Sequence, residues 1–333
     1  MTTATKKPAT LGELKKSGYK SIPIREEMRR NLIARMASNT PLFPGVVGYD
    51  NSVIPQVQNA ILAGQDIILL GERGQAKSRI IRALVELFDE EMPIVEGSEV
   101  NDDPTAPISR YAQDMVEEQG DATPIKWVGR DHRYGEKLAT PDISIADLIG
   151  DVDPIRIAEG RYLSDELAIH YGLIPRTNRG LFCINEMPDL AERIQVGLFN
   201  LMEERDVQIK GYRVRLPLDI IVVASANPED YTNRGRIITP LKDRYGAQIR
   251  THYPREASLE IAIMEAERTV FADTESRVVV PAYMKEIIAE YTMLARKHPE
   301  INQRSGVSVR VSIANYETVV ANAVRRSITQ GEE

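Results

Sequence analysis

The sequence predicts an α/β fold, in which a parallel β-sheet core is followed by a smaller, wholly helical region. An apolar strand at residues 66–70 leads through a glycine-rich turn into an amphipathic helix, the order that opens a parallel sheet. Two further apolar runs, at residues 181–185 and 219–226, have the length of buried strands. Beyond Pro254 the apolar residues recur only at helical spacing.

The segments before the first strand are predicted as an arm and two helices. The first 20 residues are small, polar and rich in lysine, so we expect a mobile arm. A helix follows from Arg25, and the stretch at residues 41–48, with two prolines and two glycines, ends it. The second helix begins near Ser52, and Gly64 ends it just before the strand.

The middle of the chain is less regular. Between residues 101 and 140 we expect one strand, at 125–128. The strand at 181–185 precedes an amphipathic helix, and residues 206–216 alternate around Gly211 as a protruding β-hairpin does.

Two helices with apolar faces are predicted near the C-terminus. The first face comprises Met284, Ile287, Ile288, Tyr291 and Leu294, and the second comprises Val309, Ile313, Tyr316 and Val320. We therefore divide the chain into an N-terminal arm and helix (1–40), an α/β core (41–253) and a helical region (254–333), with the boundary near Tyr253.

Composition excludes several classes of protein. The 333 residues include 42 Lys and Arg against 49 Asp and Glu, a net charge of −7, which makes a nucleic-acid binder unlikely. One cysteine, Cys183, excludes an internal disulfide and an all-cysteine zinc site. The histidines, His132, His170, His252 and His298, show no i, i+4 pair, so we expect no histidine metal site. Without a signal peptide or an apolar run near the ~20 residues that span a bilayer, we expect a cytoplasmic protein with no membrane span.

A phosphate-binding motif follows the first strand. Its residues are Gly71, Glu72, Arg73, Gly74, Gln75, Ala76, Lys77 and Ser78, which fit G-x-x-x-x-G-K-[ST] except at Ala76. In such a loop backbone N–H groups converge on phosphate oxygens, Lys77 reaches the β- and γ-phosphates, and the Ser78 hydroxyl binds Mg²⁺. The Ala76 methyl is tolerable if the φ of that residue is negative. The competing interpretation is an ordinary strand–turn–helix with a chance lysine.

A second motif ends the strand at 181–185. Asn185 and Glu186 stand where P-loop ATPases usually carry Asp-Glu, a pair that binds Mg²⁺ and orients or deprotonates the attacking water. Glu186 fits the role of base. Asn185 keeps an oxygen acceptor but no charge, so Mg²⁺ binding should be weaker or depend more on Ser78 and phosphate. The pair is also compatible with a capped helix N-terminus.

The ordered series GERGQAKS, LFCINE, VVASANPED, TPLKDRYG and SGVSVRVS resembles the AAA+ ATPases, which are P-loop NTPases with a three-layer αβα core and a helical lid. More narrowly, the sequence is similar to the MoxR group and to the ATPase subunit (subunit I) of magnesium chelatase, over roughly residues 45–325. This resemblance implies two insertions in the core, at about 157–177 and 206–216. Asn185 departs from the family pattern and bears on hydrolysis more than on nucleotide binding. The sequence does not establish that the lid is complete.

The resemblance also implies roles for residues outside these two motifs. Asn227 corresponds to sensor 1, which helps Glu186 polarise the attacking water, and Arg310 corresponds to the phosphate-facing sensor 2. Asn227 is also compatible with a strand-terminating turn, and without the other motifs Arg310 would be only a solvated charge.

Arg244 corresponds to the arginine finger, which would act on the γ-phosphate in the neighbouring subunit. Arg234 and Arg236 are rival candidates, and a surface salt bridge with Asp243 or another acid is the competing interpretation. An arginine finger that acts in the site of a neighbouring subunit requires an oligomer, which the resemblance implies to be a hexameric ring. The candidate contacts for a partner protein, which are equally compatible with solvated loops, are Lys210, Tyr212, Arg213 and Arg215.

Three functional hypotheses follow. The first is an ATP- and Mg²⁺-dependent motor that remodels a partner, by resemblance one with a von Willebrand A domain, as in chelatase complexes. Metal insertion into a tetrapyrrole would then be an output of the complex, because the sequence shows no porphyrin site. The second is an ATP-binding scaffold that hydrolyses little because of Asn185. The third, a DNA-acting AAA+ protein, lacks a recognisable DNA-binding module.

Overall fold

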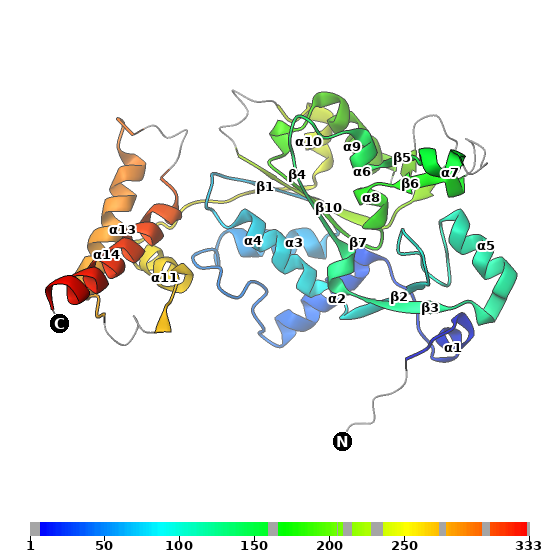
Figure 1. The fold of residues 1–333 in the computed structure, drawn as a ribbon, viewed down its shortest axis with the longest axis horizontal. Coiled ribbons are helices and arrows are strands. Elements are labelled where there is room, and N and C mark those ends of the chain that lie inside the picture. The colour runs from blue at the N-terminus through cyan, green and yellow to red at the C-terminus, as the bar shows by residue number, and fades with distance from the viewer. Residues whose placement is uncertain are drawn as a thin grey trace, which may run out of the picture.

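The computed structural model describes residues 7–158, 166–204, 206–208, 215–227, 236–272, 278–301 and 307–331. Its centre is a parallel sheet with strand order β11-β1-β10-β7-β4 (Figure 1). The strands are β1 (Ile67–Leu70), β4 (Tyr134–Leu138), β7 (Gly180–Asn185), β10 (Ile220–Ala226) and β11 (Ala247–Arg250). The three apolar runs of the sequence form the adjacent strands β1, β10 and β7, and the edge strands β4 and β11 were not predicted.

Successive residues of the strands point into two different cores. Ile67, Cys183 and Val223 face α2 (Ile24–Ala37), α3 (Val53–Leu62) and α4 (Lys77–Ala83). Ile68 and Phe182 face the opposite core, which includes α9 (Glu192–Glu204) and α10 (Thr239–Arg244). Helices therefore cover both faces of the sheet, and the predicted three-layer α/β class is confirmed.

The N-terminal segment is packed against the chain, so the prediction of a mobile arm is wrong over residues 8–17. Helix α1 (Leu11–Lys16) buries Leu11 and Leu14. The carbonyl of Pro8 accepts a hydrogen bond of 2.9 Å from the indole N–H of Trp127. The two leucines, spaced at i, i+3, provide enough apolar surface to dock a segment that is otherwise polar.

A small β-unit receives this segment. Strands β2 (Glu91–Val95) and β3 (Ile125–Gly129) pair antiparallel, and α5 (Arg110–Gln119) lies between them in the chain. The strand predicted at 125–128 is confirmed as β3, whereas β2 was not predicted.

Short elements lie at the two predicted insertions. In the first, α7 (Pro154–Ala158), η4 (Glu166–Ala168), β6 (Ile169–Tyr171) and α8 (Leu173–Arg176) follow one another, and β6 pairs with β5 (Gly150–Val152). In the second, β8 (Asp206–Gln208) pairs antiparallel with β9 (Arg215–Pro217), while the tip of the hairpin lies outside the described residues. The remaining short elements are η1 (Leu84–Leu87), η2 (Gly120–Ala122), η3 (Arg130–Arg133), α6 (Ile145–Leu148) and η5 (Met187–Asp189).

The C-terminal helices α11 (Ala257–Glu267), α13 (Ala282–Lys297) and α14 (Val309–Gln330) lie together at one end of the molecule (Figure 1). They pack around Met264, Ile288 and Tyr316. The buried Glu260 of α11 accepts hydrogen bonds from Arg296 of α13 and Ser312 of α14. One carboxylate thus joins all three helices. The domain boundary near Tyr253 stays a prediction.

The apolar face predicted for α13 is only partly buried. Ile288 faces the neighbouring helices, but Ile287, Tyr291 and Leu294 are 61%, 64% and 65% exposed. Helical spacing places these residues on one side of the helix, and it cannot tell whether that side meets a partner or solvent. Within the described residues, no helix combines the length and apolar character needed to cross a bilayer.

Candidate functional site

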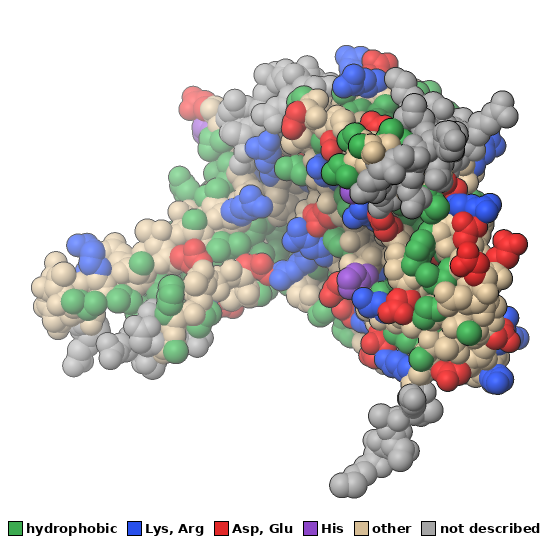
Figure 2. Space-filling view, turned by 45° about the vertical axis from the view of Figure 1, so that its right-hand side comes forward, with side chains coloured by type: hydrophobic (Ala, Val, Ile, Leu, Met, Phe, Trp, Pro, Cys, Tyr) green, Lys and Arg blue, Asp and Glu red, His purple; other side chains and the backbone are tan. Residues whose placement is uncertain are grey.

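A cavity of about 1000 Å³ lies between the α/β part and the C-terminal helices. Figure 2 shows Lys and Arg side chains gathered where these two parts of the molecule meet. Nine of the residues predicted as functional from the sequence line this cavity. Six belong to the phosphate loop, and the other three are Asn185, Glu186 and Arg310. The six loop residues are Arg73, Gly74, Gln75, Ala76, Lys77 and Ser78. Gly71 and Glu72 lie at the start of the loop, and neither they nor Asn227 and Arg244 are among the residues that line the cavity.

The phosphate loop contains two residues with left-handed backbone. Gly74 has φ +75°, and a Cβ there would come within 2.7 Å of the Ser308 Cβ, so the C-terminal helices approach this glycine closely. Ala76 has φ +55°, so the negative φ that was the condition for tolerating its methyl is not met. An L-residue in this region costs about 1–2 kcal/mol. The methyl of Ala76 is therefore accommodated with backbone strain, because the loop must turn sharply just before α4.

Lys77 lies at the first position of α4 and is buried. Its ammonium group donates hydrogen bonds to the carbonyls of Gly71, at 2.5 Å, and Glu72, at 2.8 Å. The Ser78 side chain is exposed to the cavity. A charged donor and a hydroxyl thus stand at a helix N-terminus, as anion binding requires.

Buried side chains from distant segments brace the loop. The Gln75 Oε1 atom accepts hydrogen bonds from the Thr251 hydroxyl, at 2.6 Å, and from the Glu72 N–H, at 3.0 Å. The Tyr49 hydroxyl donates to the carbonyls of Gln75, at 3.0 Å, and His252, at 2.8 Å. Burial raises the pKa of Tyr49 to about 12, although hydrogen bonding with the His252 backbone and the Thr251 side chain opposes the shift. Gln75 belongs to the predicted motif, whereas Thr251 and Tyr49 were not predicted because no local motif contains them.

Glu186 occupies a strained position at the end of β7. Its φ is +54°, and its backbone N–H donates to the Ser225 hydroxyl at 3.2 Å. The Glu186 Oε2 atom is buried and has no hydrogen-bond partner among the described residues. Left-handed backbone and an unsatisfied buried oxygen are both uncommon, and both occur preferentially at functional sites.

Asn185 is held in an extended hydrogen-bond network. Its Nδ2 atom donates to Glu136 Oε1 at 2.5 Å, and its Oδ1 atom accepts from the Ser225 hydroxyl at 3.0 Å. Arg82 of α4 donates to both oxygens of Glu136, at 3.0 and 3.1 Å. Glu136 and Arg82 were not predicted as site residues, although both line the cavity.

The C-terminal helices complete the cavity wall. Arg310, at the start of α14, is exposed and forms no ion pair with any other described residue. Arg79 of α4 forms an ion pair with Glu267 of α11, and the Tyr253 hydroxyl donates to the Arg73 carbonyl at 2.9 Å. Helix α4 is therefore in direct contact with α11, and the phosphate loop is in direct contact with the segment that leads into α11.

The other predicted functional residues lie outside the cavity lining. Asn227 is buried directly after β10. Arg244 forms an ion pair of 2.5 Å with Glu203 and lies over the Phe199 ring, so it has the salt bridge named as its competing interpretation, with Glu203 as the acid. Arg236 is exposed and Arg215 lies in β9. Outside the described residues are Arg234, Lys210, Tyr212 and Arg213.

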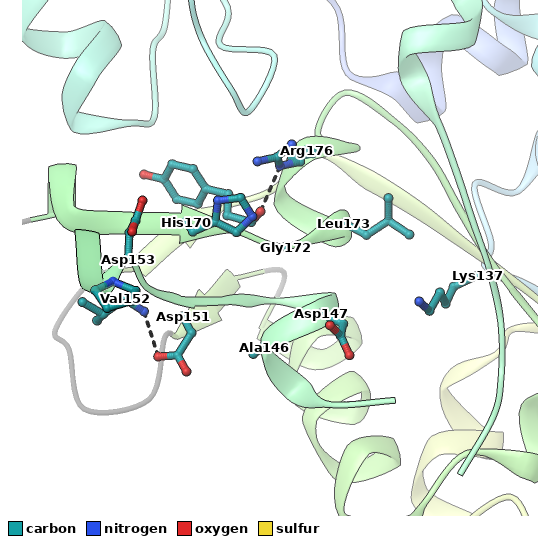
Figure 3. A pocket seen from close by; sticks show the side chains of 12 residues that line it. Lys137, Ala146, Asp147, Asp151, Val152, Asp153, His170, Gly172, Leu173 and Arg176 are labelled. Atoms are coloured by element: carbon teal, nitrogen blue, oxygen red, sulfur yellow. Dashed lines mark hydrogen bonds between the residues drawn. The ribbon is translucent and has the colours of Figure 1, made fainter. Parts of the chain in front are cut away.

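A second cavity, of about 580 Å³, is lined by residues around β5, β6 and α8 (Figure 3). Several of its polar groups serve local structure: Asp151 accepts from the Val152 N–H, and Arg176 donates to the Tyr171 carbonyl. Among the described residues of the chain, no group of three or more His, Cys, Asp or Glu side chains is arranged to hold a metal ion. This cavity contains none of the predicted site residues.

No protein-family model matches the chain. Relatives include magnesium-chelatase subunit ChlI of Nostoc sp., which is 26% identical over 263 residues, covering 77% of this chain and 64% of that protein. The ChlI subunit of Mesostigma viride is 26% identical over 286 residues, covering 82% and 73%. The magnesium-chelatase 38 kDa subunit of Rhodobacter capsulatus is 25% identical over 248 residues, covering 72% and 65%.

Among solved structures, the chain is similar to one from a complex of the BchI and BchD subunits of magnesium chelatase. The TM-score is 0.48 and the identity 23%, over 77% of this chain and 74% of that one. The chain spans 64% of the length of the Nostoc relative. The sequence comparisons confirm the predicted resemblance of this chain to the ATPase subunit of magnesium chelatase.

Proposed function

We propose that this chain is an AAA+ ATPase of the magnesium-chelatase type, which binds ATP with Mg²⁺ and hydrolyses it. One observation carries the proposal: a single cavity gathers Lys77, Glu186 and Arg310 from three separate parts of the chain. A lysine at a helix N-terminus, a buried carboxylate and a further arginine are the groups that phosphoryl transfer uses for binding, water activation and charge stabilisation.

The residues present fit a nucleotide with its metal. One part of the cavity lining is polar and carries Lys77 and Ser78, while Val46, Ile263 and Ile313 provide apolar surface suited to a base. The volume of about 1000 Å³ is at the upper end of the range for small-molecule sites. When bound, Mg²⁺ would neutralise phosphate charge, and the Ser78 hydroxyl would help to hold it.

Glu186 is the proposed general base. Its Oε2 atom is free of protein hydrogen bonds among the described residues, so it can accept one from a water molecule. The left-handed backbone fixes the direction of the side chain at the end of β7. Asn227, buried after the neighbouring strand β10, is proposed to help orient the same water.

Phosphate release from ATP tests the proposal. We expect turnover in the wild-type chain, loss of about 100-fold or more in Glu186→Gln, and loss of nucleotide binding in Lys77→Ala. Glu86→Gln, an exposed glutamate paired with Arg35 and Arg130, is the matched control and should behave as wild type. Nucleotide binding without turnover, restored by Asn185→Asp, would instead support the ATP-binding scaffold.

We further propose that the chain acts as an oligomer, by resemblance a hexameric ring, in which Arg244 serves the neighbouring subunit. In support, Arg244 lies outside the cavity of its own chain, and its ion pair with Glu203 is partly exposed. A mixture of Glu186→Gln and Arg244→Ala chains should regain part of the activity that each variant lacks alone, because mixed interfaces contain one intact pair. If the mixture of the two variants stays inactive, Arg244 does not act in the site of a neighbouring subunit.

The proposed partner is a protein with a von Willebrand A domain, with metal insertion into a tetrapyrrole as one possible output of the complex. Its support is the similarity to chelatase subunits over most of this chain. The likeness to MoxR proteins, the cytoplasmic location and the absence of nucleic acid among the partners stay predictions.

A further inference from the structure

Glu136 places a carboxylate beside Asn185, on the wall of the cavity where the resemblance predicts an aspartate. Strands β4 and β7 are parallel neighbours, with Glu136 opposite Cys183 and Leu138 opposite Asn185. Residues two apart on a strand share a face, so Glu136 and Asn185 are on the same face of the sheet. Both line the cavity, whereas Lys137, between Glu136 and Leu138, lines the second cavity (Figure 3).

The hydrogen bonds of Asn185 fix which of its atoms faces Glu136. The Asn185 Oδ1 atom accepts from the Ser225 hydroxyl at 3.0 Å and from the Cys183 thiol at 3.6 Å. The Nδ2 atom therefore points the other way and donates to Glu136 Oε1 at 2.5 Å. The oxygen that the sequence assigned to Mg²⁺ is engaged with the neighbouring strand, and the group that Asn185 orients toward the cavity is a carboxylate.

Glu136 is paired with a cation and accepts hydrogen bonds from the side chains of Arg82, Tyr134 and Asn185. In the absence of a metal, the guanidinium of Arg82 is the counter-charge of this carboxylate. Arg82 lies one helical turn after Ser78 on α4, so the cation and the predicted metal-binding hydroxyl lie on the same side of the helix.

We propose that Glu136 supplies the negative charge that Asn185 lacks, so that Ser78 and Glu136 form the protein side of the Mg²⁺ site and Asn185 positions Glu136. The inference rests on the proposed function, because the metal enters with the nucleotide. The same inference gives a role to Arg82: its guanidinium neutralises the charge of Glu136 until a metal ion binds there. The side chain of Arg82 is largely exposed and can move aside into solvent.

The test measures metal affinity separately from nucleotide affinity. Mn²⁺, which replaces Mg²⁺ and is detected by electron paramagnetic resonance, is titrated into each chain saturated with a non-hydrolysable ATP analogue. Binding of the analogue in EDTA is measured in parallel. Glu136→Gln should weaken Mn²⁺ binding about tenfold or more without changing analogue binding in EDTA. The control Glu86→Gln removes a glutamate from a different arginine pair and should change neither quantity.

Two further variants make the outcome specific. Asn185→Asp added to Glu136→Gln should restore Mn²⁺ affinity, because it returns a carboxylate to the same wall of the cavity. Arg82→Gln should tighten Mn²⁺ binding, because it removes the competing cation, and it gives a result even if Glu136→Gln does not fold.

Unchanged Mn²⁺ affinity in Glu136→Gln, or in Arg82→Gln where the first variant is insoluble, would overturn the inference and leave the proposed function standing. A wild-type chain that binds no analogue, with or without metal, would overturn both.

Discussion

Glu260→Ala should loosen the C-terminal helices without unfolding the sheet. Glu260 is completely buried and accepts two hydrogen bonds of 2.7 Å from Arg296 and one of 2.5 Å from Ser312. Its removal leaves Arg296, whose side chain is only 9% exposed, without a carboxylate. Breaking a buried ion pair by removing one partner costs about 3–5 kcal/mol. Among the described residues, the central apolar cluster of these helices is small, with Met264, Ile288 and Tyr316 as its buried members, so this loss is large for them.

The consequence should reach the phosphate loop. Arg296 lies over the Tyr253 ring at 4.5 Å, and the Tyr253 hydroxyl donates to the Arg73 carbonyl. We therefore expect weaker nucleotide binding in Glu260→Ala, although Glu260 does not line the cavity.

Amide hydrogen exchange by mass spectrometry measures the opening free energy of each segment. Protection in α11, α13 and α14 should fall by about 3–5 kcal/mol, with α2 and α3 unchanged. The control is Glu265→Ala on the same helix, which removes a surface ion pair with Lys285 and should cost at most about 1 kcal/mol. Equal effects of the two substitutions would refute the reasoning, because burial is the property that separates them.

Three further predictions concern the phosphate loop and the N-terminus. Ala76→Gly should raise the free energy of unfolding by about 1 kcal/mol, because glycine adopts φ +55° without strain; a lower melting temperature would contradict this. Tyr49 has a folded pKa of about 12, above its ordinary value of 10, so its neutral form contributes stability that is complete below about pH 10 and lost as pH rises to about 12. Urea unfolding from pH 9 to 12 should therefore show a steeper loss in wild type than in Tyr49→Phe, by about 3 kcal/mol in total, and parallel curves would exclude this linkage. Leu14→Ala should cost about 2–5 kcal/mol because Leu14 is fully buried, whereas a loss below about 0.5 kcal/mol would restore the mobile arm.

The central strands and the phosphate loop were predictable because their signals are local. β1, β7 and β10 are buried on both faces and therefore read as unbroken apolar runs. The edge strand β4 has the sequence YGEKL, whose Glu136 and Lys137 face two different cavities, so its pattern is not apolar. This segment is a strand because it pairs with β7, and its own five-residue sequence does not predict that pairing.

The residues of the site also differ in whether the sequence could predict them. Lys77 and Glu186 belong to contiguous motifs, whereas Tyr49 and Glu136 reach the cavity from segments whose own sequences carry no functional signal. The positive φ of Ala76 could not be predicted, because the motif shows which residue is present but not how the loop turns.

The single thiol of the chain has a practical consequence. Cys183 is buried in β7, and burial, with a smaller contribution from Glu136, raises its pKa to about 12. Reagents that attack thiolates at neutral pH will leave it unmodified. A cysteine introduced on the exposed side of α13 and another on α2 would then be the only reactive positions. Dyes attached there would report the separation between the C-terminal helices and the sheet as nucleotide is added, without first engineering the native cysteine away.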